Sequence, residues 1–173
     1  MRPRFAVSAV RVLCLSLSIA FIVGACGAPA GDEGQMEATS WQTLLGEEMY
    51  MGDMVALSYE TDEEQVTGVR HREVLDLGEF VGKTLVPIVL VFYDPLAEHA
   101  PSVIMQMERL SEQAGEAAAI LLITPDAEDD FLTMFNHEWL PMFVMVKDGA
   151  ALDEIVGLDD QTIARLNEFI GSE

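Results

Sequence analysis

Cysteine is almost absent from this chain. Only Cys14 and Cys26 occur, and no residue after Cys26 is a cysteine. The part of the chain after Cys26 is therefore expected to have no disulfide, no thiolate nucleophile and no cysteine ligand for a metal ion. This absence excludes reactions in which thiols of that part attack or resolve a disulfide.

Positive charge is also scarce. All 30 Asp and Glu residues lie after Cys26, together with only six of the nine Lys and Arg residues. Lysine itself occurs only at Lys83 and Lys147. A domain this acidic repels nucleic acid and anionic lipid headgroups. The sequence therefore predicts a strongly negative surface and no nucleic-acid partner.

The N-terminal segment is organised like a secretory signal. Arg2, Arg4 and Arg11 form a basic head, and an apolar run over residues 12–23 follows it. Small residues come next, which completes the pattern of a signal peptide. The apolar run is too short for a comfortable bilayer span. The rest of the chain is therefore expected outside the cytoplasm.

The stretch Val23-Gly24-Ala25-Cys26 resembles the lipobox of bacterial lipoproteins. That resemblance implies cleavage before Cys26 and lipidation of its thiol, which would anchor the protein to a membrane. The alternative is an ordinary signal peptide cut near Ala28 or Ala30, with Cys26 incidental. The expected location is the cell envelope, on the periplasmic side of the outer or inner membrane in a Gram-negative host.

These features divide the chain into three parts. Residues 1–25 are the predicted signal peptide. Residues 26–38 begin with the lipidated cysteine and continue as a small, polar segment with Gly and Pro, which is typical of a flexible tether. Residues 39–173 are long enough for one domain with a hydrophobic core of its own.

Six segments have the composition of strands. Two of them, Val86–Tyr93 and Ala118–Ile123, are nearly continuous apolar runs, as expected of strands that are buried on both faces of a sheet. The shorter predicted strands are Val55–Tyr59, Val66–Leu75, Met142–Val146 and Leu152–Val156. A turn at Lys147-Asp148-Gly149-Ala150, where Gly149 can supply positive φ, joins the last two.

Four segments have the periodicity or caps of helices. They are Thr39–Gly52, His99–Ala114 with Gly115 as C-cap, a short helix after Thr124-Pro125, and a last helix capped by Asp159 or Asp160. A helix and two strands thus precede the order β-α-β-α-β-β-α. This order predicts an α/β domain: a three-layer α/β/α sandwich with a mixed central sheet.

Five short stretches, in this order, resemble the thioredoxin-like superfamily. They are Leu75–Lys83, Phe92-Tyr93-Asp94-Pro95, Leu140-Pro141-Met142, Val146-Lys147-Asp148-Gly149 and Ile155-Val156-Gly157. The first is similar to the lead-in of membrane-anchored thioredoxins and peroxiredoxins. The resemblance covers about Leu75 to Ile170. It implies a thioredoxin-like fold and a cis bond before Pro141.

The redox motif of that superfamily is missing. Its two cysteine positions are Ala97 and Ala100, and the residues between them are Glu98 and His99. A buried carboxylate that many members carry is replaced by Val91. We therefore expect no enzyme activity and no catalytic residue. His99 is either a general base or ligand, or an exposed residue at a helix start, and the second interpretation is favoured.

The site that remains could still bind a protein or a peptide. In the superfamily, an extended peptide lies beside the cis-proline. The resemblance therefore implies a groove lined by six residues: Tyr93, Leu96, His99, Leu140, Pro141 and Met142. The alternative is that these side chains pack the top of the domain and have no other role.

Two further hypotheses stay open. The domain could be an auxiliary of a thiol–disulfide or cytochrome-maturation system whose partner supplies the cysteines. It could also bind copper, because Met49-x-Met51-x-x-Met54 has a spacing seen in Cu(I) sites and thioethers are soft ligands. His99, Met105 and Met107 could add to such a site. Methionine also fills cores, so no cofactor and no metal ion is expected.

Overall fold

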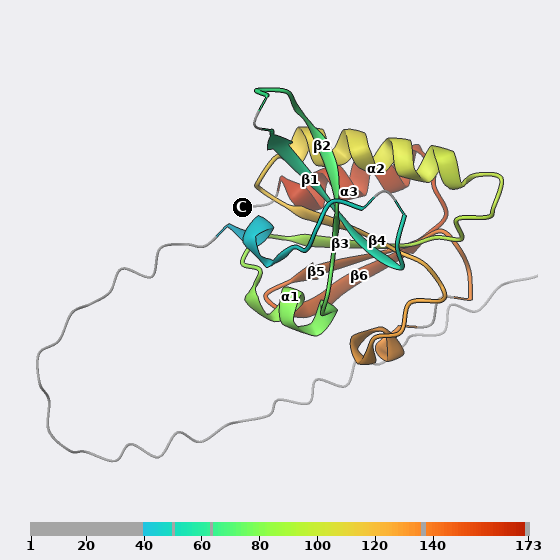
Figure 1. Cartoon of the computed structure of the whole chain (residues 1–173). Helices are drawn as coiled ribbons and strands as arrows, with labels where there is room; N and C mark the ends of the chain where they lie inside the picture. Colours follow the sequence, from blue (N-terminus) through green and yellow to red (C-terminus); the bar gives the residue numbers. More distant parts are fainter. Residues whose placement is uncertain (1–39, 50, 63, 136–137, 172–173) are drawn as a thin grey trace, which may run out of the picture. The chain divides into compact units, whose positions relative to one another are not determined.

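A six-stranded mixed sheet forms the centre of the fold, with strand order β2-β1-β4-β3-β5-β6 (Figure 1). The strands are β1 (Met54–Thr61), β2 (Thr67–Glu73), β3 (Ile88–Phe92), β4 (Ala119–Ile123), β5 (Met142–Lys147) and β6 (Ala150–Val156). Strands β3 and β4 are parallel, and the other neighbouring pairs are antiparallel. All six predicted strands are confirmed.

The computed structural model describes residues 40–49, 51–62, 64–135 and 138–171. Residues Met36–Glu173 form one compact unit, which contains every helix, strand and core residue of the described chain. The predicted signal peptide (1–25), Cys26 and the tether (26–38) lie outside the described residues. Within the described ranges, no helix is long and apolar enough to cross a bilayer.

Helices cover both faces of the sheet. The α-helices are α1 (Leu77–Lys83), α2 (Ala100–Ala114) and α3 (Asp160–Ile170), and the 3-10 helices are η1 (Trp41–Leu44) and η2 (Asp130–Met134). Helices α2 and α3 pack on one face, while α1, η1 and η2 pack on the other (Figure 1). The three-layer α/β/α arrangement with a mixed sheet is therefore as predicted.

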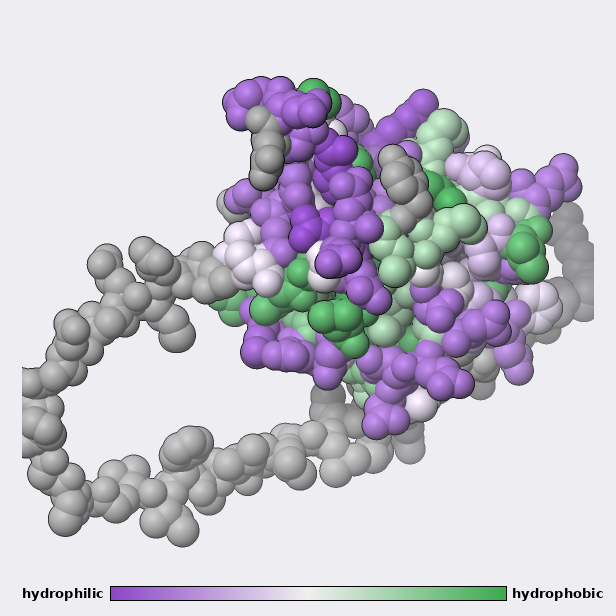
Figure 2. Space-filling view, viewed as in Figure 1, coloured by the Kyte–Doolittle hydropathy of each residue, from purple (hydrophilic) through white to green (hydrophobic). Residues whose placement is uncertain are grey.

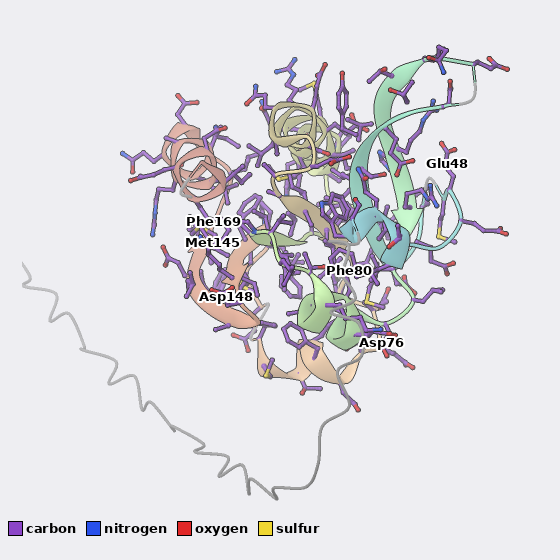
Figure 3. All side chains as sticks on the ribbon, turned by 90° about the vertical axis from the view of Figure 1, so that its left-hand side faces the viewer. Glu48, Asp76, Phe80, Met145, Asp148 and Phe169 are labelled. Carbon is purple, nitrogen blue, oxygen red and sulfur yellow. The ribbon has the colours of Figure 1, made fainter. Side chains whose placement is uncertain are left out.

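The two faces of the sheet carry separate cores. All five residues of β3 are buried, and they alternate between the cores because successive strand side chains point to opposite faces. Figure 3 shows Phe80 of α1 on one side, and Met145 of β5 beside Phe169 of α3 on the other. This double burial is why β3 and β4 are continuous apolar runs in the sequence.

The predicted turn between β5 and β6 is confirmed. Asp148 has φ 53° and Gly149 has φ 72°, so both central residues are left-handed, as a type I′ turn requires. Two predicted helix ends are confirmed as well. Gly115 follows α2 with φ 57°, and Asp159 caps α3 through a carboxylate that accepts from the Thr162 backbone N–H at 2.8 Å.

The helix predicted over Thr39–Gly52 is wrong. Among the described residues of this range only η1 forms, and it ends at Leu45, whose backbone is extended. The segment pairs instead with the outer edge of β2: the Gly46 N–H donates to the Glu73 carbonyl at 2.8 Å, and the Met49 N–H donates to the His71 carbonyl at 2.7 Å. Backbone pairing with a distant strand outweighs the local apolar periodicity.

Two shorter elements also differ from the prediction. Helix α1 was not expected, because its seven residues include two glycines; the Asp76 carboxylate caps it by accepting from the Glu79 N–H at 2.7 Å. The helix expected after Thr124-Pro125 is the 3-10 helix η2, and its cap is Asp129. Thr124 instead bonds to Asp53.

Candidate functional site

One row of paired residues crosses the sheet where β3 and β4 finish. Val156 pairs with Met142, Met142 with Phe92, Phe92 with Ile123, and Ile123 with Met54. We call this end the carboxyl end of the sheet. In open α/β sheets, ligands bind in the crevice outside the carboxyl ends of the parallel strands. A ligand-binding site is therefore expected in the loops beyond this row.

The positions that the resemblance aligns with a redox motif form a tight turn at this end. The Ala97 N–H donates to the Asp94 carbonyl at 3.1 Å, and the Ala100 N–H donates to the Ala97 carbonyl at 3.0 Å. Helix α2 begins at Ala100, which is buried, whereas Glu98 and His99 are exposed. His99 is the N-cap residue of α2 and makes no side-chain capping bond.

The peptide bond between Leu140 and Pro141 is cis, as the resemblance implied. Pro141 is buried, and its carbonyl accepts from the Gly157 N–H at 2.8 Å. The segment before β5 is therefore held against the end of β6. Leu140 is half-buried and packs at the edge of the core on the α1 side.

Three of the six residues expected to line a groove are buried: Tyr93, Pro141 and Met142. Tyr93 and Met142 are both buried, and they belong to cores on opposite faces of the sheet. Met142 faces the α1 side because its strand partner Phe92 does so. Burial raises the pKa of the Tyr93 hydroxyl. Of the six, Leu96 stands out at 92% exposed.

Exposed apolar side chains gather at the carboxyl end instead. Six of the large hydrophobic residues exposed in the described chain lie in its loops or at its strand ends: Met51, Leu75, Leu96, Met134, Trp139 and Val156. We call these the apolar set. The far end of the β1–β2 hairpin, in contrast, is covered mainly by hydrophilic side chains (Figure 2). Apart from Leu96, the set was not predicted.

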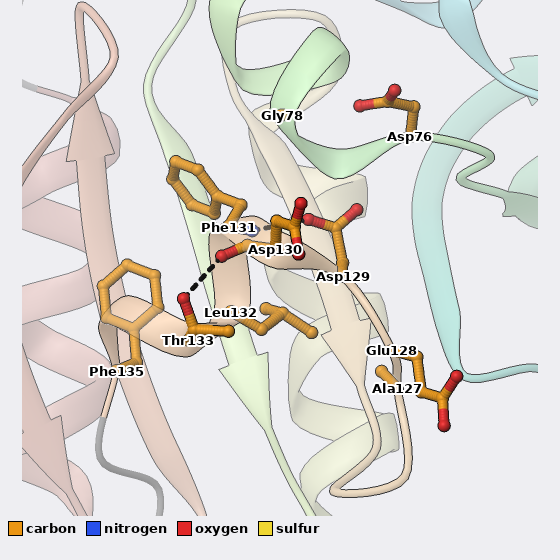
Figure 4. A pocket seen from close by; sticks show the side chains of 10 residues that line it. All are labelled: Asp76, Gly78, Ala127, Glu128, Asp129, Asp130, Phe131, Leu132, Thr133 and Phe135. Carbon is orange, nitrogen blue, oxygen red and sulfur yellow. Dashed lines mark hydrogen bonds between the residues drawn. The ribbon is translucent and has the colours of Figure 1, made fainter.

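An acidic pocket of about 760 Å³ opens beside α1 and η2 (Figure 4). Its residues are Asp76, Gly78, Ala127, Glu128, Asp129, Asp130, Phe131, Leu132, Thr133 and Phe135. Four of them are acids, and the described lining includes no lysine or arginine. We call this the α1–η2 pocket. It combines negative charge with apolar side chains, two of which are aromatic.

A second pocket, of about 580 Å³, contains the methionine motif. Its lining is Met49, Met51, Gly52, Asp53, Met54, Glu73, Val74, Leu75, Asp126 and Glu128. We call this the methionine pocket. The other residues suggested for a copper site do not join it. Met107 is fully buried in the core on the α2 side, and neither Met105 nor His99 is part of the lining.

Comparison with known proteins finds similarity only at the level of solved structures. No protein-family model and no curated protein matches the chain. The chain is similar to thioredoxin from Aeropyrum pernix, with 15% identity, a TM-score of 0.48, and coverage of 69% of this chain and 96% of that one.

Two yeast structures are similar to this chain with nearly the same TM-score. The mitochondrial 1-Cys peroxiredoxin has 13% identity and a TM-score of 0.47, and the match covers 65% of this chain and 93% of that one. Mitochondrial thioredoxin 3 of Saccharomyces cerevisiae has 17% identity and a TM-score of 0.47, with 55% and 91% covered. Because identities are this low, the function must be inferred from the site.

Proposed function

We propose that this protein is a lipid-anchored binding module of the cell envelope. Its thioredoxin-like domain performs no thiol–disulfide chemistry. It holds an extended polypeptide segment that carries both apolar and basic side chains, and it does so at the carboxyl end of the sheet. Cys26 carries the lipid, and residues 26–38 give the domain reach from the membrane.

The apolar set is the observation that carries this proposal. Its six residues come from five separate parts of the chain, yet all lie at the end of the sheet where a ligand would bind. Leu96 and Trp139 are 92% and 72% exposed, so they contribute little to folding. Large side chains that stay exposed at the end of a sheet where ligands bind suit an interaction site, and burying them against a partner would stabilise the complex.

The charge of this surface favours one kind of segment. The α1–η2 pocket and the methionine pocket open at the same end of the sheet, and together their linings include Asp53, Glu73, Asp76, Asp126, Glu128, Asp129 and Asp130. Basic side chains complement these carboxylates, and the negative field would speed their approach. An acidic segment would be repelled. An extended, basic and apolar peptide therefore fits both properties of this surface.

The lack of catalysis follows from the turn at the start of α2. Thioredoxin chemistry needs a low-pKa thiolate there and a second thiol to resolve the mixed disulfide. The corresponding positions, Ala97 and Ala100, carry methyl groups. If the bound segment carries cysteines, the module would serve as an auxiliary of a thiol–disulfide or cytochrome-maturation system. The identity of the segment decides this point.

Binding of short fluorescent peptides, followed by anisotropy, tests the proposal. An extended peptide with alternating basic and apolar residues should bind, and its acidic counterpart should not. Leu96→Ser and Trp139→Ser should each weaken binding by about tenfold, which is the loss expected for one exposed apolar contact. Leu85→Ser is the matched control, because Leu85 is 82% exposed at the opposite end of the sheet.

Equal binding by these variants and the control would overturn the proposal, as would equal binding of the acidic peptide. A charged residue at Met142 is not a useful test. Met142 is 2% exposed and packs in the core, so such a variant would unfold whatever the site does. Leu96 and Trp139 can be changed without that effect on folding.

A further inference from the structure

The methionine pocket has properties that peptide binding does not require. Met49, Met51 and Met54 line it together, although the second of them is 81% exposed. A methionine that only fills a core would be buried, as Met107 is. Three methionines thus line one hollow: Met51 is open to solvent, whereas Met54 also packs against the core on the α1 side.

Backbone hydrogen bonds hold the described residues at both ends of this motif. The Met49 N–H donates to the His71 carbonyl at 2.7 Å. At the other end, the Thr124 N–H donates to the Asp53 carbonyl at 2.9 Å, and the Val74 N–H donates to the Met54 carbonyl at 3.1 Å. A ligand set held on an anchored loop loses less entropy when it binds an ion.

Gly52 allows the sulfur of Met49 to turn back over the loop. That sulfur occupies the space that a Cβ atom would take at Gly52. The thioether of Met49 therefore lies against the backbone between Met51 and Met54. Any larger residue at position 52 would push the sulfur away, and because φ at Gly52 is not in the left-handed region, alanine would not strain the backbone there.

The chemistry of the lining favours one kind of ion. Thioether sulfur is a soft ligand that selects Cu(I) over hard cations such as Mg²⁺ or Ca²⁺. In the part of the chain that the structure describes, no three His, Cys, Asp or Glu residues are placed to hold a metal ion. The pocket carboxylates Asp53, Glu73, Asp126 and Glu128 would instead attract a cation through their field.

We propose that Met49, Met51 and Met54 bind one Cu(I) ion through their thioether sulfurs. No electron is transferred in this step, since the ion arrives and leaves as Cu(I). The site goes beyond the proposed peptide binding and does not depend on it. His99, Met105 and Met107 take no part.

A Cu(I) titration tests this site. The chain from Met36 to Glu173 contains the whole described fold and no cysteine, so thioethers are its only sulfur ligands. Under anaerobic conditions, with Cu(I) held by a coloured chelator, it should remove one equivalent with a dissociation constant below micromolar. The triple variant Met49→Leu/Met51→Leu/Met54→Leu should lose this binding, since leucine keeps the volume but has no sulfur.

Two matched pairs make the result specific. Gly52→Ala should weaken binding by about tenfold, a loss of about 1.4 kcal/mol, because it displaces one sulfur without removing a ligand. Gly68→Ala should have no effect, since a Cβ atom at Gly68 meets nothing within 4 Å. The surface methionine Met105, changed to leucine, should also leave Cu(I) binding unchanged.

Circular dichroism of every variant confirms that the fold is intact. The inference is overturned if the unchanged chain takes up no Cu(I), or if the triple variant takes up as much. Tighter binding of Zn(II) that survives the triple substitution would overturn it too. Peptide binding is measured without metal, so failure of one proposal leaves the other standing.

Discussion

The carboxylate of Asp129 accepts a hydrogen bond from the backbone N–H of Leu77 at 3.1 Å. Its second oxygen accepts from the Phe131 N–H at 2.8 Å. One side chain therefore ties the start of α1 to the start of η2, although the two helices are far apart in the sequence. These are the two elements that form the α1–η2 pocket.

Replacing Asp129 by alanine should lower the free energy of unfolding by about 1–3 kcal/mol, because it leaves two backbone N–H groups without their partner. Leu77 is fully buried, so water would not easily replace the lost bond. Urea unfolding measures the change. Asp130→Ala is the control, since that exposed side chain should change stability by no more than about 0.5 kcal/mol. Equal losses of unfolding free energy in both variants would contradict the stabilising role of the two Asp129 hydrogen bonds.

Helix α3 should show a cap that depends on pH. The Thr162 backbone N–H, assisted by the Thr162 hydroxyl, holds the pKa of Asp159 below its usual range. A lowered folded-state pKa stabilises the protein above the unfolded-state pKa, about 4, and this contribution is lost as the pH falls through the folded value.

Asp159→Asn keeps a good cap but removes this titration. The melting temperatures of the protein and the variant should therefore differ most near neutral pH, and the difference should shrink below about pH 4. Thermal unfolding across this range measures it. The protein and the variant share all other acidic residues. The effect of pH on repulsion among those residues therefore cancels when the two melting temperatures are compared. A difference that stays constant with pH would show that the Asp159 charge does not matter.

Membrane attachment should depend on one of the two cysteines. Cys26→Ser removes the thiol that the lipobox-like sequence offers for acylation, so the protein should move from the membrane fraction to the soluble fraction and lose incorporation of labelled fatty acid. Cys14→Ser should change neither property, because Cys14 lies within the predicted signal peptide. If the Cys26 variant stays in the membrane fraction, the anchor is elsewhere.

Restoring two thiols should restore exchange chemistry. The unchanged domain should not accelerate the reduction of insulin by dithiothreitol. The variant A97C/A100C places cysteines at the start of α2, where the helix N-terminus favours a thiolate, so we expect it to gain this activity. The single variant A97C has no resolving thiol and should remain inactive. Activity of the unchanged domain would refute the loss of function.

Strands β3 and β4 were predictable because their burial on both faces requires a continuous apolar sequence. Five consecutive buried residues in β3 and in β4 require five consecutive apolar residues, and no local element competes with that pattern. The prediction for the segment Thr39–Gly52 failed because a contact distant in sequence, and not the local pattern, decides its structure. Its periodicity suggested a helix, but Gly46 and Met49 pair with β2, which lies more than twenty residues further along the chain.

The site was predictable only where a local motif marks it. The alanines at positions 97 and 100 and the cis bond before Pro141 follow from short matching stretches. The apolar set has no such motif, since its members come from five parts of the chain whose common location follows only from strand order and direction. Met142 was assigned to the surface because the sequence does not show which way β5 turns its side chains.

The pairing of Gly46–Met49 with β2 also bears on how the protein behaves at high concentration. A sheet has two edges, and an uncovered edge can recruit a strand from another molecule. Here Gly46–Met49 cover the outer side of β2 at residues 71–73, and the other edge of the sheet is β6. That strand carries Asp153 and Glu154, and Asp153 pairs with Arg165. Neighbouring copies crowded together should therefore resist joining edge to edge into fibrils.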